Sequence, residues 1–447
     1  FDCCIGGNYM GTAFTNELTT QFLDFVNTAT SPYHVVDTSK KILELAGFKE
    51  LTFDSTWNLE AGKSYYTDLF GTSLFAFRLP EDFTNESIFR ICVSHTDHPG
   101  FRIKPNPDLF DKGYWKLNVE TYGGAILNTW MDRPLSLAGK VTLKNHDSVF
   151  KPITKIVDFK RPLLTIPNLA IHMNRSINKG VELNKQIDMM PLFSMHTNKK
   201  DTDAFNFLEF LAEELKTDKD QILDYDLSVY NCESGCLLGA RKEFYSCPRL
   251  DNLTSVYASL QAITMTEDND KDIMLCGFLD NEEIGSRTKQ GADSLSMHNL
   301  LKKIYTAFIP SEETFINTLH KSYMISADVA HALHPNHPEK NDITNFSKLN
   351  EGIVIKWNSN QRYATDTEAI GVIQQICETY AIPYQKFANR SDIPGGGTLG
   401  SITSAWLPMK TVDIGVPILA MHSARETGGV QDEISLMRLL HAYFSCE

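Results

Sequence analysis

Carboxylate and imidazole side chains follow several apolar, strand-like runs of this sequence at the point where each run ends. In open α/β sheets, functional groups gather at the carboxyl ends of the strands. The side chains in these positions are Asp280, Glu282 and Glu283 in "LDNEEIGS", His95 and Asp97 in "SHTDHPG", Asp328, His331 and His334 in "ADVAHALH", and His422 in "LAMHSARE". Asp251, in "PRLDN", stands just ahead of a predicted helix.

The adjacent carboxylates Glu282 and Glu283 raise a problem of charge, because like charges held close disfavour each other's ionised form. Two divalent ions about 3.5–4 Å apart would offset that repulsion and activate a bridging water. Glu283 can then bind metal while Glu282 faces the water as general base. Asp97, two residues after His95, is predicted to fix the tautomer of that imidazole. Zinc suits this mixture of oxygen and nitrogen ligands, and manganese or cobalt are alternatives.

Each of these features also has an ordinary structural explanation. A histidine after a strand is usually a satisfied core or surface residue, and paired glutamates often begin a helix, where its dipole favours negative charge. Asp251 can be an N-cap, and Asp328 a plain loop carboxylate. The ordinary explanation weakens because five separate boundaries, from residue 95 to residue 422, carry the same types of ligand.

The bulk composition is that of a globular protein large enough for two or three domains, with 447 residues, 42% hydrophobic and 22% charged. A net charge of −14 argues against nucleic acid as a general partner. No apolar run reaches the roughly 18 residues of a membrane span, and no basic-then-apolar leader is present. The nine cysteines are odd in number and lie mostly in apolar runs, which favours reduced thiols and a cytoplasmic location over a disulfide framework. Cys232 and Cys236 in "CESGC" are a weaker candidate ligand pair.

The predicted secondary structure differs between the middle of the chain and its two flanks. Two helices within 15–51 and strands at 73–80 and 87–95 come first, and helix and strand alternate again after residue 245. The stretch between them has short β-like pieces at 114–130, 137–145 and 161–173 and one amphipathic helix at 201–217. We therefore expect an α/β sandwich with a mixed, largely parallel sheet, formed by residues 12–100 and 236–447, with an inserted β-rich domain at 101–235. Residues 1–11 are left out of this expectation.

Several segments resemble the signature segments of the aspartyl aminopeptidase family, which are co-catalytic zinc exopeptidases. They are "FVNTATSPYHVV", "SHTDHPGFRIKP", "VETYGGAILNTWMDRPLSLAGKV", "PRLDNL", "DNEEIGS", "MISADVAHALHPNHPEK", "IKWNSNQRYAT" and "LAMHSARE". Together they cover nearly the whole chain in the family's order. The three consecutive glycines of "SDIPGGGTLGSI" depart from the family pattern.

The resemblance implies a role for each matching residue. Asp251 would bridge two metal ions, His95 and Asp328 would complete one site, and Glu283 and His422 the other. Glu282 would be the general base and Asp97 would support His95. His172, in "IPNLAIHMNR", would act in the active site of a neighbouring subunit, and Lys356 would bind an acidic substrate side chain. The implied assembly is a tetrahedral dodecamer built from dimers through the β-rich domain.

The predicted function is therefore a metal-dependent aminopeptidase that removes an N-terminal residue, preferably Asp or Glu, from peptides with a free amino terminus. A neutral or basic first residue is the nearest alternative. A carboxypeptidase or deacylase on the same scaffold and a non-enzymatic shell protein are further alternatives. The shell protein is disfavoured because every predicted ligand and the base are present.

Overall fold

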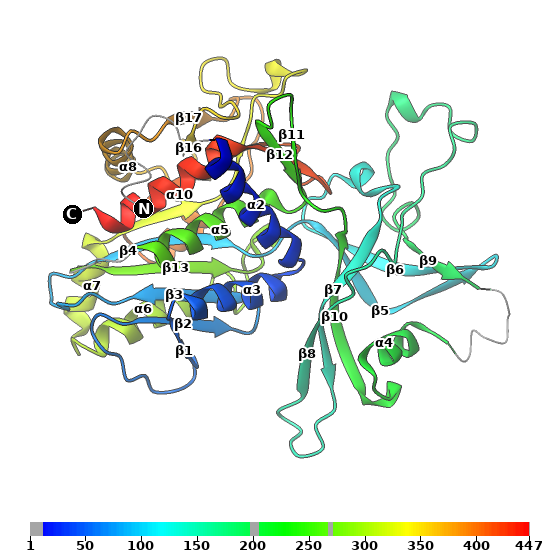
Figure 1. Ribbon diagram of the computed structural model, residues 1–447, viewed down its shortest axis with the longest axis horizontal. Helices are drawn as coiled ribbons and strands as arrows, with labels where there is room; N and C mark the ends of the chain where they lie inside the picture. The colour runs from blue at the N-terminus through cyan, green and yellow to red at the C-terminus, as the bar shows by residue number, and fades with distance from the viewer. Residues whose placement is uncertain (1–11, 197–204, 267–270, 447) are drawn as a thin grey trace. The chain divides into compact units, whose positions relative to one another are not determined.

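The computed structural model describes residues 12–196, 205–266 and 271–446 (Figure 1). The chain forms two compact units. The first unit contains the residues up to Asp97 together with 235–421 and 426–447, and the second contains 98–234 and 422–425. The short segment 422–425 thus belongs to the second unit. The division into a catalytic and a dimerisation domain stays a prediction.

A nine-stranded sheet is the centre of the first unit, and its strand order is β1-β2-β3-β13-β4-β14-β18-β16-β17. The four strands β13, β4, β14 and β18 run parallel, whereas β3 and β16 run antiparallel to their neighbours β13 and β18. This confirms the predicted α/β fold with a mixed, largely parallel sheet. The strands are β1 (Lys49–Leu51), β2 (Ser64–Leu69), β3 (Ser73–Arg78), β4 (Phe89–His95), β13 (Ile273–Leu279), β14 (Tyr323–Ala327), β16 (Ile353–Trp357), β17 (Tyr384–Ala388) and β18 (Lys410–Gly415).

The central strands are rich in apolar residues because both faces of the sheet are covered. Along β4, Ile91 and Val93 pack into one core cluster and Cys92, between them, packs into the other. In β13 the same alternation places Leu275 with Ile91 and Cys276 with Cys92. Successive side chains of a strand point to opposite faces, so an unbroken apolar run fills two cores at once.

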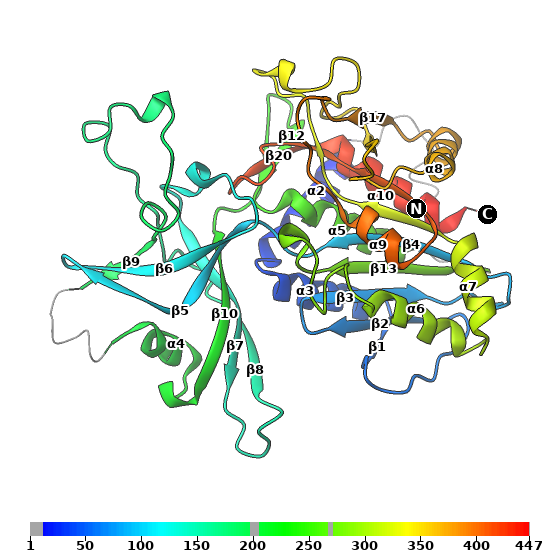
Figure 2. The ribbon, with the colours of Figure 1, turned by 180° about the vertical axis from the view of Figure 1, so that it is seen from behind.

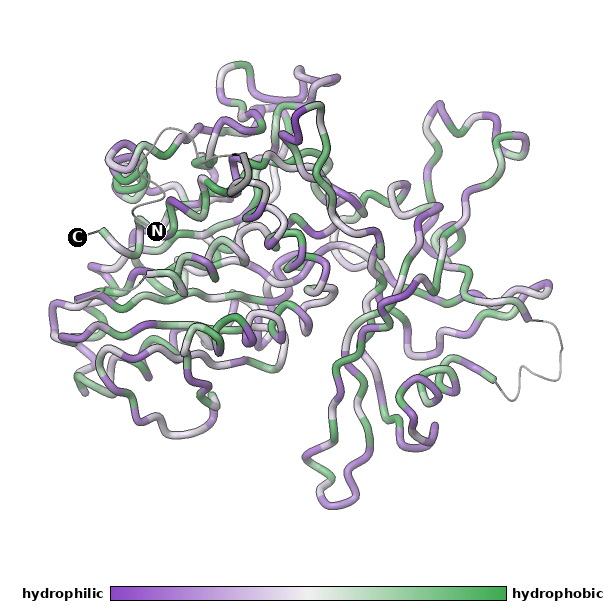
Figure 3. The backbone as a smooth tube through the Cα atoms, viewed as in Figure 1, coloured by the Kyte–Doolittle hydropathy of each residue, from purple (hydrophilic) through white to green (hydrophobic). Residues whose placement is uncertain are grey.

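Helices cover both faces of this sheet, as Figures 1 and 2 show from opposite sides. On one face lie α2 (Thr12–Thr28), α3 (Pro32–Leu45), α5 (Leu250–Met265), α8 (Thr367–Thr379) and α10 (Val430–Ser445). On the other lie α6 (Ser296–Thr306), α7 (Glu312–Lys321) and α9 (Leu399–Trp406). Along α10, hydrophobic stretches alternate with hydrophilic ones (Figure 3), and most residues of this helix are buried between the sheet and the neighbouring helices.

A small five-stranded sheet of the first unit was not predicted, because its strands are only two to four residues long and are too short for an alternating pattern. Its order is β11-β12-β20-β19-β15. The strands are β11 (Cys236–Leu238), β12 (Phe244–Cys247), β15 (Ala330–His331), β19 (Pro417–Leu419) and β20 (Glu426–Gly429). It connects the segments just before Asp251 and just after Asp328.

The second unit contains a six-stranded antiparallel sheet, in the order β8-β7-β10-β5-β6-β9, and helix α4. These elements are β5 (Gly100–Asp111), β6 (Tyr114–Tyr122), β7 (Leu135–Leu143), β8 (Ile153–Asp158), β9 (Leu192–Met195), α4 (Phe207–Leu215) and β10 (Ile222–Asn231). Helix α4 lies within the predicted helix 201–217, of which residues 201–204 are outside the described residues. The β-like reading of 161–173 was wrong as a strand: only isolated bridges form there, at 164–166, and the polypeptide after Pro167 is exposed.

Short 3₁₀ turns complete the secondary structure of the described residues. They are η1 (Leu127–Trp130), η2 (Ile177–Lys179), η3 (Lys219–Gln221), η4 (Glu282–Ile284) and η5 (Pro338–Lys340). Within the described parts of the chain, no helix combines the length and the apolar character that crossing a bilayer requires. The seven cysteines in those parts are unbridged thiols.

Candidate metal centre

The candidate site lies where three parallel strands of the first unit end side by side. His95 is the last residue of β4 and pairs in register with Leu279, the last residue of β13. Asp328 follows β14 directly, and Glu282 follows β13 by three residues. Because neighbouring parallel strands end at the same edge, their first loop residues are brought together whatever their distance in sequence.

His95 is the buried centre of this group, with 1% of its surface exposed. Its Nε2 atom lies 3.1 Å from Oδ1 of Asp251 and 3.6 Å from Oδ1 of Asp328. Its Nδ1 atom lies 3.0 Å from the backbone carbonyl of Asp97 and 3.4 Å from that residue's carboxylate. With Nδ1 protonated and donating to Asp97, Nε2 is the ring nitrogen that can bind a cation shared with the two other carboxylates; without a cation, a proton on Nε2 would be donated to them.

Asp97 also binds the backbone of the segment that carries the two glutamates, a contact that the sequence does not reveal. Its two carboxylate oxygens accept the backbone N–H groups of Glu282 and Glu283, each at 3.1 Å. Asp97 is 1% exposed, so these are buried, charge-assisted hydrogen bonds. They fix the first turn of η4, and with it the two glutamates, against the end of β4.

The turn that carries Asp251, at the start of α5, is held by hydrogen bonds between side chains and backbone groups. One carboxylate oxygen of Glu426 accepts the N–H groups of Leu250, at 2.6 Å, and of Asp251, at 3.2 Å. The side-chain amide of Asn252 donates to the carbonyl of Ala327, at 2.8 Å, and so links this turn to the end of β14. Glu426 was part of a quoted sequence segment but was given no role, since a carboxylate that binds backbone N–H groups leaves no spacing pattern.

The electrostatics of the group are those of carboxylates crowded out of water. Burial, and then repulsion from neighbouring carboxylates, raises the pKa of Glu282 to about 8. Burial and the charge of Asp251 raise the pKa of Glu283 well above its usual value. Burial alone would lower the pKa of His95, but hydrogen bonds to carboxylates, those of Asp251 and Asp328 first, raise it well above its usual value.

Lys356 brings a buried ammonium to the border of this group. It lies on β16, is 2% exposed, and its Nζ atom is 3.9 Å from Oδ2 of Asp328. The same atom lies 5.3 Å from the ring centroid of Tyr363. Asp413 on β18 is fully buried; burial raises the pKa of its carboxyl and the charge of Lys356 opposes that shift. An acidic residue inside a run as apolar as "MKTVDIGVPI" indicates a buried charge, and Asp413 could have been found from the sequence in this way.

Comparison with known proteins agrees with this arrangement. The family model described as "Aminopeptidase I zinc metalloprotease (M18)" matches residues 25–444. A "Probable M18 family aminopeptidase 2" from Clostridium novyi (strain NT) is 44% identical over 433 residues, which are 97% of this chain and 98% of the relative.

The chain belongs to the M18 family of zinc aminopeptidases.

Solved structures show the same fold for this M18 aminopeptidase. The structure described as "Cryo-EM structure of the Ape4 and Nbr1 complex" is 34% identical with a TM-score of 0.93, and the match covers 98% of this chain and 87% of that one. The crystal structure of prApe1 is 25% identical with a TM-score of 0.90, over 96% and 94% of the two chains.

The donor set of this M18 aminopeptidase fits the zinc that the family implies. Ligand atoms of His95, Asp251 and Asp328 lie within 4.8 Å of one another, and so do those of His95, Glu282 and Glu283. Imidazole nitrogen and carboxylate oxygen are ligands that zinc accepts. The raised pKa values of Glu282 and Glu283 also fit a zinc site, because a cation among these carboxylates would compensate their repulsion.

The predicted site residues of this M18 chain are divided between the two units. His422 begins the four-residue segment that belongs to the second unit, where its Nδ1 atom lies 3.1 Å from the carbonyl of Gly124. His172 also belongs to the second unit, where it is exposed. In the first unit, His331 and His334 follow β14 as Asp328 does, but both are exposed and neither is part of a ligand group among the described residues.

Proposed function

We propose that this M18 aminopeptidase removes N-terminal aspartate or glutamate from peptides, with two metal ions and with Glu282 as general base. The observation that carries the proposal is the group around His95, in which one imidazole and four carboxylates have ligand atoms within 4.8 Å of one another in sets of three. His95, Asp251 and Asp328 are buried, and the two glutamates are half-buried. So many ionisable groups in a buried place destabilise a metal-free protein and are useful only with a compensating charge.

The ligand roles follow from the contacts within the first unit and, for His422, from the family resemblance. Asp251 would bridge the two ions, since its ligand atoms lie within 4.8 Å of those of both His95 and Glu283. His95 and Asp328 would complete one site, and Glu283 and His422 the other. Bound divalent ions would supply the Lewis-acid polarisation of the scissile carbonyl and lower the pKa of a water.

Glu282 is the residue proposed to move the proton. Its carboxylate would accept a proton from the attacking water and return it to the nitrogen of the departing peptide. Asp97 positions it for that transfer, because it binds the N–H of Glu282 itself. A pKa raised to about 8 by burial makes the metal-free carboxyl basic, and cations nearby would lower that pKa toward the working range.

Lys356 supports the acidic preference. A buried ammonium beside the ligand group would attract the side-chain carboxylate of a first residue, and burial strengthens that interaction. The nearest alternative, a neutral or basic first residue, is favoured by one observation: Lys356 already lies 3.9 Å from the carboxylate of Asp328. The family itself favours an enzyme over a non-enzymatic shell protein.

His172 and the assembly form the second part of the proposal. A solved structure that is 24% identical, with a TM-score of 0.83, is described as the mApe1 dodecamer, a likeness that shows the fold alone. We extend that assembly to this chain through its β-rich second unit, on which the exposed His172 would reach a neighbour's active site. Mixed assemblies of His172→Phe and Glu282→Gln subunits should then regain turnover, and verified mixtures that regain none would contradict the role in trans.

A substrate panel tests the main proposal. Protein loaded in turn with zinc, manganese and cobalt is assayed on fluorogenic amides of acidic, neutral and basic residues, with N-acetylated peptides as a test for deacylase or carboxypeptidase chemistry. We expect turnover mainly of the Asp and Glu amides and none of the blocked peptides, since an aminopeptidase needs the free amine. Glu282→Gln should remove turnover with metal content retained, and Glu313→Gln on the exposed side of α7 is the matched control. Equal or faster turnover of neutral or basic residues would refute the acidic preference.

A further inference from the structure

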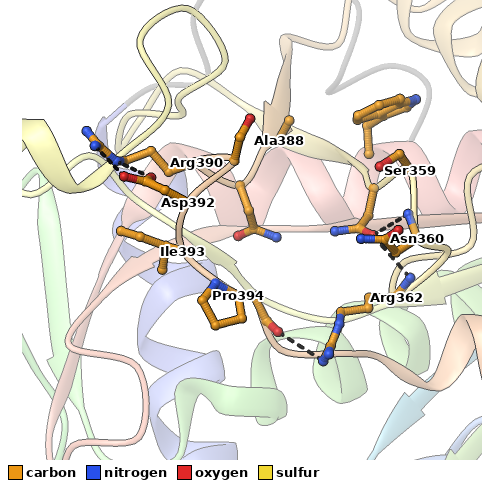
Figure 4. Close-up of a pocket in the computed structure, with 13 residues that line it drawn as sticks. Ser359, Asn360, Arg362, Ala388, Arg390, Asp392, Ile393 and Pro394 are labelled. Carbon is orange, nitrogen blue, oxygen red and sulfur yellow. Dashed lines mark hydrogen bonds and ion pairs between the residues drawn. The ribbon is translucent and has the colours of Figure 1, made fainter.

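A surface pocket lies between the loops that follow β16, the strand that carries Lys356, and β17 (Figure 4). It has a volume of about 400 Å³ and is lined by residues 357–360, 362 and 388–395. That volume is in the range of pockets that hold a few residues of peptide or a small molecule. None of the residues given a role in catalysis or in binding the first residue is part of the lining.

The pocket is lined by two arginines, of which, within the described chain, one is paired with a carboxylate and the other is not. On one side, Arg390 forms a bidentate pair with Asp392, at 2.7 and 2.8 Å, and also donates to the carbonyl of Glu339. Arg362 lies on another side of the pocket, as Figure 4 shows, and donates one N–H to the carbonyl of Gly395 at 3.2 Å. Among the described residues of the lining, Arg362 is thus the cation that has no carboxylate partner.

Arg362 is held in place by its own loop. The carbonyl oxygen of the Asn358 side chain accepts the N–H groups of Asn360 and Arg362, and the carbonyl of Arg362 accepts the N–H of Thr398. These contacts order the backbone of the loop, and the hydrogen bond to the carbonyl of Gly395 restricts the guanidinium, so that less side-chain freedom is lost when a carboxylate binds.

Apolar surface and amide groups accompany this cation. Trp357 is 51% exposed and Ile393 is 40% exposed, although both are large apolar side chains. The Asn389 amide donates to the hydroxyl of Tyr363, whose ring faces the Nζ atom of Lys356. Tyr363 therefore separates the pocket from the buried ammonium by a single side chain.

We propose that this pocket binds a carboxylate of the peptide beyond its first residue, with Arg362 as the anion-binding group and Trp357 and Ile393 as apolar contacts. The inference rests on the proposed function, because it takes the substrate to be a peptide held near Lys356. Two carboxylates have the required chemistry: an acidic side chain further along the peptide, and the terminal carboxylate of a short one.

Binding of blocked peptides tests the pocket without any turnover. Metal-loaded Glu282→Gln protein is titrated with fluorescent N-acetylated peptides of one length: one with two glutamates and an amidated end, one with glutamines and an amidated end, and one with glutamines and a free carboxylate. Binding of one or both carboxylate peptides should be about tenfold tighter than that of the neutral peptide, the usual effect of one charge-assisted hydrogen bond. The peptide that binds more tightly than the neutral one shows whether the pocket takes an acidic side chain or a terminal carboxylate.

Arg362→Gln, in the same background, should remove this preference, and Arg362→Lys should keep part of it. Arg241→Gln changes an exposed arginine outside the pocket and should have no effect. The proposal is overturned if the starting protein shows no preference, if Arg362→Gln keeps it, or if Arg241→Gln also loses it.

Turnover separates a failure of this inference from a failure of the proposed function. In the otherwise unaltered enzyme, Arg362→Gln should raise KM for an Asp-initiated peptide with a downstream glutamate and leave the Asp fluorogenic amide unchanged. If the enzyme cleaves neither substrate, the proposed function fails, while the binding titration still decides whether the pocket holds a carboxylate.

Discussion

Replacing Asp97 by asparagine tests how the two catalytic glutamates are held. The aspartate accepts two backbone N–H groups at 3.1 Å in a place that is 1% exposed. Asparagine keeps one acceptor oxygen and turns the other position into an NH₂ group that faces an N–H donor. The change therefore removes one charge-assisted bond, worth about 1.5–3 kcal/mol, and leaves one buried N–H without an acceptor. A local cost of about 2–4 kcal/mol follows.

Hydrogen exchange of the backbone amides at 282 and 283 measures this cost directly. Because 1.4 kcal/mol corresponds to a factor of ten, local opening should become about 30-fold more frequent or more in Asp97→Asn. Affinity for zinc should fall about 10- to 100-fold, as is usual when a group that orients a ligand is lost. Asp342→Asn is a fitting control, since Asp342 binds the N–H groups of Thr344 and Asn345 in an exposed turn. Unchanged exchange at 282 and 283, with unchanged turnover, would refute this account of Asp97.

Three further predictions concern other residues of the first unit. Glu282→Gln should lower kcat by a factor of about 10² or more with the metal content unchanged, which elemental analysis beside a kinetic assay will show; retained turnover would remove the base assignment. Lys356→Met should lower kcat/KM for Asp amides by about 10- to 100-fold relative to alanine amides, and an equal loss on both would mean that Lys356 has only a structural role. Burial raises the pKa of Asp432 to about 7, so the folded state holds this proton more tightly than the unfolded chain does. Above the unfolded value near 4 the folded state therefore loses stability as the pH rises to about 7, and the stability of the protein relative to Asp432→Asn should fall over that window; a pH-independent difference in melting temperature would contradict the shift.

The sequence predicts the central architecture well because the physical signals there are strong. In β4 and β13, short and largely apolar runs indicate strands buried on both faces, and the polar residues at their ends then meet at one edge of the sheet. The strands β16 and β17 and helix α7 were not predicted. In β16 the run "IVIKW" is only five residues long and ends on a lysine and an exposed tryptophan, so its period cannot be distinguished from that of a loop.

Within the site, residue types and spacing identify the ionisable groups but not their partners. The sequence suggests that Asp97 serves His95 through its carboxylate, whereas the shorter contact to the ring is from the backbone carbonyl and the carboxylate binds the turn of Glu282. Glu426 shows the same limit: its partners are N–H groups 176 and 175 residues away in sequence. Such contacts depend on loop geometry, which short-range patterns do not encode. The roles of His172 and His422 remain predictions.

The position of Glu426 bears on the order in which this protein can mature during synthesis. The turn that presents Asp251 is anchored by Glu426, which follows it by 175 residues, after the polypeptide has left the first unit for a second time. A ribosome that has finished β18 has therefore released every other carboxylate of the centre but not the anchor of this one. Zinc capture should lag behind translation until Glu426 emerges, and chains that end before residue 426 should accumulate without metal.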